Sequence, residues 1–325
     1  MVGSATRSAR SLAALAAVWV LLHAVPAEAL NIKSYVSSSG VDSNTCADPG
    51  FNACATFQGA LAKTAPGGEI TVANTGNYGS VDIFQSVNIT NDGAGEASIL
   101  VSGGGEGIGV AAGIGDVVSL RGLLLDGQRA GVQGIGIASG SAVHIQNCVI
   151  RNIEGSFAQG INAFGGNQLF VSDTIIFNNG STAGTGGILI RPFGSMNVVL
   201  DRVHLENNVV GLRVDGTNST GDGAHVVMRD SVVSGNAADS ILALSAPGKA
   251  PAFILVEHTS SVSNGGIGIH ADGPRATILL KDDTITRNGA GISATNSGQL
   301  ISYGNNSNNN NVGPEGTPTG LFSLM

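Results

Sequence analysis

The chain has 325 residues and a formal net charge of −8, and only 12% of its residues are charged. An acidic chain without a basic cluster is poorly suited to bind nucleic acid or an anionic membrane surface. Glycine is abundant at 49 residues, aromatic residues make up 4%, and Val, Ile, Asn, Ser and Thr are plentiful. This composition is typical of many short strands joined by tight turns, rather than of a disordered chain.

The first segment has the pattern of an export signal. Arg7 and Arg10 precede the uncharged apolar run 12–22, and Ala27-Glu28-Ala29 follows as a cleavage site with small residues. The pattern predicts a signal peptide over residues 1–29 and a secreted or periplasmic protein. The apolar run has about half of the ~20 residues that a transmembrane helix needs. No later apolar segment is longer, so we expect no membrane span.

The three cysteines fit an oxidising compartment. Cys46 and Cys54 flank a short loop before the repetitive region, and we expect a disulfide between them, with two free thiols as the alternative. Cys148 lies within an apolar strand pattern. We interpret it as a buried structural thiol, because the sequence offers no base that would activate it.

A Gly-Ile element recurs at intervals of 23 to 29 residues, and each copy continues as a short alternating strand. Ser240-Ile241 fills the one place where the glycine is missing. The copies are Gly107-Ile108, Gly134-Ile135, Gly160-Ile161, Gly187-Ile188, Gly211-Leu212, Gly268-Ile269 and Gly291-Ile292. Self-similarity at such a period indicates a solenoid.

Each period also contains a second apolar strand, a polar residue directly after it and an asparagine six residues later. The polar residues are Asn147, Asp173, Asp201, Asp230, His258 and Asp282. The asparagines are Asn179, Asn207, Asn236, Asn264, Asn288 and Asn310, with Asn152 one place early in the first copy. Stacked asparagine side chains can bond to one another and satisfy buried turn groups, so we expect a structural asparagine ladder.

These repeats predict an all-β fold, a right-handed single-stranded parallel β-helix with three strands per rung and about nine to ten rungs over residues 70–310. One rung cannot bury its inner face alone, whereas stacked rungs form a continuous core. A leucine-rich repeat is disfavoured because its fixed leucine spacing is absent. A calcium-binding β-roll is disfavoured because Gly265-Gly266-Ile267-Gly268-Ile269-His270 occurs once and has His where a ligating Asp belongs.

Both ends of the stack need covers. Phe57, Ala60 and Leu61 have helical spacing, so we expect a short capping helix within an N-terminal cap over residues 30–69. The C-terminal cap or tail is expected over residues 311–325, with Leu321 and Phe322 folding back over the end of the stack. Such covers protect the unpaired strand edges at the ends of a solenoid.

The chain resembles secreted bacterial right-handed β-helix repeat proteins of the pectin-lyase-like superfamily, over residues 40–320. The resemblance rests on Cys54-Ala55-Thr56-Phe57-Gln58, Pro66-Gly67-Gly68-Glu69-Ile70-Thr71-Val72, Gly76-Asn77-Tyr78-Gly79 and Val87-Asn88-Ile89-Thr90 near the start, and on Ser302-Tyr303-Gly304-Asn305-Asn306 and Gly316-Thr317-Pro318-Thr319 near the end. It implies the β-helix fold. It implies little about activity, because the superfamily spans lyases, hydrolases and binding proteins.

Catalytic motifs of this superfamily are missing. Polygalacturonase-like members combine an Asp-Asp with Gly-His-Gly and Arg-Ile-Lys motifs, but only Asp282-Asp283 occurs here, and we interpret it as a pair of turn residues. Pectate-lyase-like members hold Ca²⁺ with several acidic residues, and no such group can be assembled from the repeats. The sequence therefore predicts no metal site and no cofactor, and it assigns no catalytic residue.

The outward positions of the Gly-Ile strands contain the densest group of charged side chains. We expect Arg191, Arg213, Asp215 and His270 to point the same way, with Arg191 beside Asp215 on adjacent rungs and His270 about two rungs further on. Two arginines can hold a carboxylate or sulfate. The alternative is an ion pair that only solvates the flank.

Two functions are consistent with the sequence. The favoured one is an exported, non-catalytic protein that binds polysaccharide, a cell-surface glycan or another surface along one flank. The alternative is a polysaccharide lyase or glycoside hydrolase with an unrecognised site. The sequence leaves the ligand, the oligomeric state and the biological role open.

Overall fold

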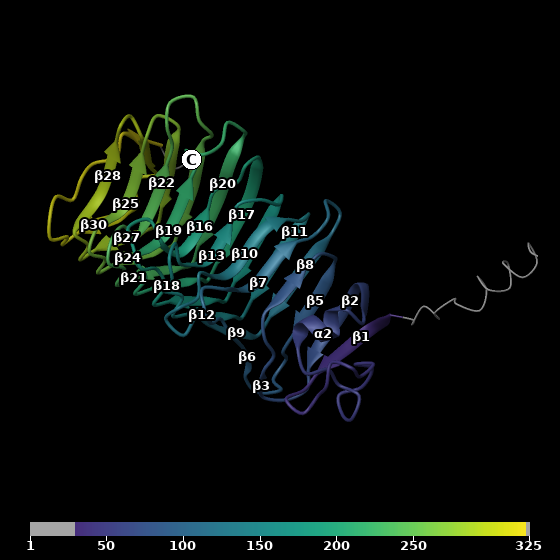
Figure 1. Cartoon of the computed structure of the whole chain (residues 1–325). Coiled ribbons are helices and arrows are strands. Elements are labelled where there is room, and N and C mark those ends of the chain that lie inside the picture. The colour runs from purple at the N-terminus through teal and green to yellow at the C-terminus, as the bar shows by residue number, and fades with distance from the viewer. Residues whose placement is uncertain (1–29, 323–325) are drawn as a thin grey trace, which may run out of the picture. The chain divides into compact units, whose positions relative to one another are not determined.

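The computed structural model describes residues 30–322, so the expected signal peptide lies outside the described residues. Residues from Asn31 onward form one unit made of three parallel sheets, whose strands follow one another side by side from β1 to β30 in Figure 1. The unit is a parallel β-helix of about nine turns, as the repeats predict. No helix in the described part is long and apolar enough to cross a bilayer.

Sheet A has twelve strands. They are β1 (Asn31–Val36), β2 (Thr64–Val72), β5 (Val87–Thr90), β8 (Val117–Arg121), β11 (Ala142–Gln146), β14 (Gln168–Ser172), β17 (Ser195–Asp201), β20 (Gly223–Arg229), β23 (Ala252–Glu257), β26 (Ala276–Lys281), β29 (Gln299–Ser302) and β31 (Gly320–Leu321). Strand β2 crosses the boundary expected at residue 70, so sheet A begins within the expected N-terminal cap.

Sheets B and C complete each turn. Sheet B contains β3 (Gly76–Asn77), β6 (Ala97–Leu100), β9 (Leu123–Asp126), β12 (Val149–Arg151), β15 (Ile175–Phe177), β18 (His204–Glu206), β21 (Val232–Ser234), β24 (Ser260–Val262), β27 (Thr284–Thr286) and β30 (Ser307–Asn309). Sheet C contains β4 (Val81–Ile83), β7 (Glu106–Ala111), β10 (Gln133–Ser139), β13 (Gln159–Ala163), β16 (Gly186–Ile190), β19 (Val210–Asp215), β22 (Ile241–Leu244), β25 (Ile267–Asp272) and β28 (Ala290–Thr295).

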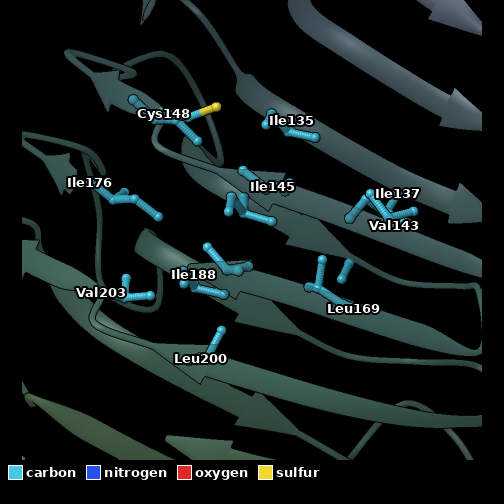
Figure 2. Close-up of a cluster of buried hydrophobic side chains, with 14 of the residues drawn as sticks. Ile135, Ile137, Val143, Ile145, Cys148, Leu169, Ile176, Ile188, Leu200 and Val203 are labelled. Atoms are coloured by element: carbon cyan, nitrogen blue, oxygen red, sulfur yellow. The ribbon is translucent and has the colours of Figure 1, made fainter. Parts of the chain in front are cut away.

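The Gly-Ile element forms the inner face of sheet C. Its apolar residues pair in register from strand to strand and are at most 5% exposed: Ile108, Ile135, Ile161, Ile188, Leu212, Ile241, Ile269 and Ile292. Figure 2 shows part of the core, where Ile135 and Ile188 share the interior with Ile145 and Leu200 of sheet A. Each strand can bury this face only because its neighbours cover it, so the core depends on stacking.

The turn between sheets B and C contains an asparagine ladder that differs from the expected one at two places. At every step the Oδ1 atom of one asparagine accepts from the main-chain N–H of the asparagine one turn earlier, along Asn179, Asn208, Asn236, Asn264, Asn288 and Asn311. Asn207 and Asn310, which the sequence suggested, lie one residue early and have left-handed φ angles of 52° and 59°. Asparagine tolerates that backbone conformation, so the two positions are turn residues and not ladder residues.

A second polar column, which the repeats did not reveal, follows sheet A. In this column a side-chain oxygen accepts from a main-chain N–H one turn earlier: Thr174 from Cys148, Ser231 from Val203 and Asp283 from Thr259. These hydroxyl and carboxylate groups accept hydrogen bonds from main-chain N–H groups that sheet pairing leaves without partners at the turn after sheet A. Asp283 is only 2% exposed, so the column holds a buried acid.

The ends of the stack are covered unequally. Helix α2 (Phe57–Leu61) begins after Thr56, whose hydroxyl accepts from the N–H of Gly59 at 2.9 Å, and it buries Phe57, Ala60 and Leu61. The expected disulfide between Cys46 and Cys54 is present nearby. At the other end β31 extends sheet A, and Leu321 is 71% exposed, so the expected fold-back over the core is wrong.

Candidate functional site

The outer face of sheet C carries two columns of side chains whose identity changes from strand to strand. The first column runs through Asp82, Gly109, Gly136, Asn162, Leu189, Arg213, Leu242, His270 and Ser293. The second contains Asp215, Leu244, Asp272 and Thr295 at its later strands. The period-two alternation of a strand places these residues opposite the buried isoleucines.

Arg213 and Asp215 form an ion pair within strand β19. The Nη2 of Arg213 lies 2.6 Å from Oδ2 of Asp215, while Oδ1 accepts from the main-chain N–H and the hydroxyl of Thr217. Asp215 is 5% exposed. Burial alone would raise the pKa of Asp215, but the Thr217 hydrogen bonds and the charge of Arg213 outweigh it and hold the pKa below its ordinary value. Asp215 is therefore a fixed anion that orients Arg213.

Arg191 does not pair with Asp215, contrary to the expectation from the strand pattern. Its Nε donates instead to Oδ1 of Asn162 at 3.3 Å. Asn162 in turn donates from Nδ2 to Oε1 of Gln133 at 3.2 Å. Arg191 has no carboxylate partner among the described residues, so its positive charge is available to a ligand.

Three hollows adjoin one another along this face, and together we call them the sheet C groove. The largest, about 490 Å³, is lined by Arg191, Arg213 and Asp215 among others. The next, about 410 Å³, shares Asn162 and Arg191 with it and adds Phe164 and Phe193. The third, about 120 Å³, shares Phe164 with the second and extends to Asp82 and Glu106.

The small end of the groove holds two carboxyl groups over a glycine floor. A Cβ atom on Gly109 would lie 2.7 Å from Oδ1 of Asp82 and 3.3 Å from Oε2 of Glu106, so these oxygens are separated by no more than the sum of the two distances. Burial, with a smaller contribution from the charge of Asp82, raises the pKa of Glu106 to about 6. Glu106 thus carries a proton more readily than an ordinary glutamate.

Comparison with known proteins identifies the fold. No family model matches the chain, and no curated protein matches it. The solved structure of pectate lyase Pel9A superposes with a TM-score of 0.66 at 17% identity, covering 90% of this chain and 78% of that chain. The chain shares its parallel β-helix fold. At this identity the likeness concerns the fold alone, and this is the fold that the sequence predicts.

The Azotobacter vinelandii mannuronan C-5 epimerase AlgE4 A-module also matches, with a TM-score of 0.44 at 15% identity. This match covers 80% of the present chain and 90% of the epimerase module.

His270 does not join the groove. It lies in register with Arg213 through Leu242, whereas Asp272 is the residue in register with Asp215. Its ring bonds to Asp239 and Thr295, and neither lines the groove. The structure therefore brings together Arg191, Arg213 and Asp215 of the four predicted site residues and places His270 in a separate cluster.

Several groove residues were missed or undervalued in the sequence. Phe193 is 71% exposed and packs edge-on to Phe164, with ring centroids 6.4 Å apart. Phe193 lies in a turn, at a position where the repeats have no recurring residue. Asp82 and Glu106 lie on the first strands of sheet C, where Gly109 and Gly136 leave space for both side chains. Only the strand register shows that the two carboxyl groups are close together.

Cys148 is buried and its thiol has a pKa raised by burial to about 11, which fits a structural role.

Proposed function

We propose that the chain is an exported protein that binds an acidic polysaccharide along the sheet C groove. The observation that carries the proposal is the groove itself, whose three hollows adjoin along several turns of the stack. A linear polymer needs such an extended, rigid track, because a preorganised surface loses little freedom on binding. The expected export signal and the disulfide between Cys46 and Cys54 support an extracytoplasmic location.

The chemistry of the lining favours an acidic sugar chain. Within residues 30–322 the guanidinium of Arg191 has no carboxylate partner, and planar guanidinium groups bind carboxylates in bidentate fashion. Arg213 is held by buried Asp215 and needs no reorganisation to present its remaining donors. Phe164 and Phe193 provide the apolar surface on which a sugar ring can lie. The similar solved structure is a pectate lyase, which supports this substrate class for the present chain.

A catalytic version of this function has one specific observation in its favour. Asp82 and Glu106 lie together at the small end of the groove, and the raised pKa of Glu106 suits a proton donor to a leaving sugar oxygen. The binding proposal is preferred because the sheet C groove is more extensive around the arginines than around this pair. An assay for turnover separates the two.

The test is calorimetric titration of the protein with polygalacturonate and with neutral galactan. Arg191→Ala should weaken polygalacturonate binding about tenfold or more, which corresponds to about 1.4 kcal/mol, and should leave thermal stability nearly unchanged. Arg213 is kept, because removing it would leave the buried carboxylate of Asp215 short of a partner. Arg121→Ala is the matched control, since Arg121 is an exposed arginine on sheet A.

Equal binding by the Arg191→Ala variant and the parent protein would place the site elsewhere. The same mixtures should be followed for absorbance at 235 nm and for new reducing ends. Turnover of polygalacturonate that is lost in Glu106→Gln would replace the binding proposal with the catalytic one.

A further inference from the structure

Three polar side chains from three successive turns meet near the C-terminal end of sheet C. Asp239 precedes strand β22, His270 lies on β25 and Thr295 ends β28. The Nδ1 of His270 lies 2.8 Å from Oδ2 of Asp239, and its Nε2 lies 2.9 Å from Oγ1 of Thr295. The imidazole therefore bridges a carboxylate and a hydroxyl. We call these three residues the Thr295 relay.

Hydrogen-bond chemistry indicates which ring nitrogen carries the proton when His270 is neutral. An ionised carboxylate can only accept, so Nδ1 of His270 then carries the proton and donates a hydrogen bond to Oδ2 of Asp239. In the neutral ring Nε2 then has a lone pair, and the hydroxyl of Thr295 must donate to it. This is the order of a nucleophile, a general base and an orienting carboxylate.

The stack itself holds the three groups in place. Neighbouring strands lie about 4.8 Å apart, so residues on successive turns come within reach of one imidazole ring. Oδ1 of Asp239 accepts from the main-chain N–H of Ile267 at 2.8 Å, which leaves Oδ2 for the ring. A Cβ atom at Gly266 would lie 2.5 Å from Oδ1 of Asp239. Glycine at position 266 is therefore required for Asp239 to reach the His270 ring.

The turn after Thr295 supplies candidate donors for an oxyanion. Asn296 and Ser297 both have left-handed backbones, with φ angles of 49° and 68°, and Gly298 closes the turn by donating to the carbonyl of Thr295 at 2.8 Å. No hydrogen bond within residues 30–322 uses the N–H of Asn296 or Ser297. The side chain of Asn296 donates to Asp272 at 2.7 Å, which orders this turn.

We propose that the Thr295 relay is a second site, separate from the sheet C groove, that hydrolyses carboxylic esters. Oγ1 of Thr295 attacks the ester carbonyl carbon while its proton passes to Nε2 of His270. The tetrahedral intermediate, bound by the N–H groups of Asn296 and Ser297, collapses as His270 returns the proton to the departing alcohol. Water then attacks the threonyl ester with His270 again as base, and this releases the acid and restores Thr295.

The competing interpretation is a purely structural set of hydrogen bonds that ties three turns together. Both interpretations predict some loss of stability when His270 is removed. Only the ester-hydrolysis proposal predicts that Thr295 reacts with an electrophile, because a structural hydroxyl gains no nucleophilicity from its neighbours. Covalent labelling of Thr295 is therefore the decisive measurement.

The experiment treats the folded chain with a fluorophosphonate probe and identifies the modified peptide by mass spectrometry. The probe should label Thr295, with loss of fluoride. Thr295→Ser should react faster, because a primary hydroxyl is less hindered, and Thr295→Val should not react. His270→Gln and Asp239→Asn should slow labelling by about 10²-fold or more. Hydrolysis of p-nitrophenyl acetate should follow the same order.

Two outcomes would overturn the proposal. One is the absence of labelling in both the parent and the Thr295→Ser variant, and the other is labelling that persists in Thr295→Val at an unchanged rate. Thermal melting of each variant shows that the fold is retained. Arg121→Ala, on sheet A and outside both sites, should be labelled as fast as the parent. Labelling of Thr295 and binding of polygalacturonate are measured separately, so a failure of the groove proposal and a failure of the Thr295 relay give different results.

Discussion

The interior of the stack and its outer surface place adjacent residues under opposite constraints. On sheet C, Ile241 faces inward at 0% exposure within an unbroken aliphatic column, while its neighbour Leu242 belongs to an outer column that also contains Gly109, Arg213 and His270. Inside, each residue must match the turns above and below it, because the core is close-packed. Outside, side chains can vary from turn to turn, so chemistry can be placed there without disturbing the fold.

The largest difference in stability should be between substitutions at Ile241 and at Leu242. Ile241→Ala removes buried methyl and methylene groups from the aliphatic column and should lower the free energy of unfolding by about 2–5 kcal/mol. Leu242→Ala, one residue away on the outer face, should cost about 1 kcal/mol or less. Urea unfolding of both variants measures the difference. Equal losses would mean that the outer column is as tightly packed as the core.

A second contrast concerns Asp283, which is buried, and Asp282, which is partly exposed. Burial, opposed by hydrogen bonds from the N–H groups of Thr259 and Lys281, raises the pKa of Asp283 to about 7. The charges of Asp282 and Glu257 raise it further. The folded protein therefore holds this proton more tightly than the unfolded chain does. The stability it contributes is fully present below about pH 4 and is lost as the pH rises through 7.

A pKa shift of this size corresponds to about 4 kcal/mol over that interval. Asp283→Asn should remove that part of the pH dependence. Asp282→Asn should reduce it only slightly, because the charge of Asp282 makes a small contribution to the raised pKa and asparagine can adopt its left-handed backbone. Urea unfolding between pH 4 and pH 8 gives the three curves. Parallel curves for Asp283→Asn and the parent protein would show that Asp283 is not the titrating group.

The sequence predicted the inward positions well because they repeat. The aliphatic column of sheet C follows directly from the Gly-Ile spacing, and the structure confirms every copy, including Ser240-Ile241. The predicted ladder residue Asn207 is one position early because the count of six starts from Asp201, the polar residue of that copy, and not from the left-handed residue of the turn. The structure has Arg202 there, with φ 52°, and arginine gives no sequence signal for that conformation. Counting six residues from Arg202 reaches Asn208.

The outward positions could be predicted only in part. Arg191, Arg213 and Asp215 share the groove as strand alternation suggested, but their hydrogen-bond partners differ from those expected. The partner of His270 is Asp239, a turn residue outside the strand repeat, so its position could not be read from the period. Long polar side chains choose among several neighbours within reach, and the choice depends on geometry that a repeat does not encode.

The smallest contrast tests the corrected ladder with the adjacent residues Asn208 and Asn207. Oδ1 of Asn208 accepts from the N–H and the side chain of Asn179, and its Nδ2 donates to the carbonyl of Ile176 at 3.0 Å. Asn208→Leu leaves buried polar groups of Asn179 and Ile176 on the preceding turn without partners and should cost about 2 kcal/mol. Asn207 is exposed with a left-handed backbone, so Asn207→Gly should change stability by about 0.5 kcal/mol or less. Urea unfolding of the two variants side by side decides which residue carries the ladder. A larger loss for Asn207→Gly than for Asn208→Leu would restore the register that the sequence alone suggested.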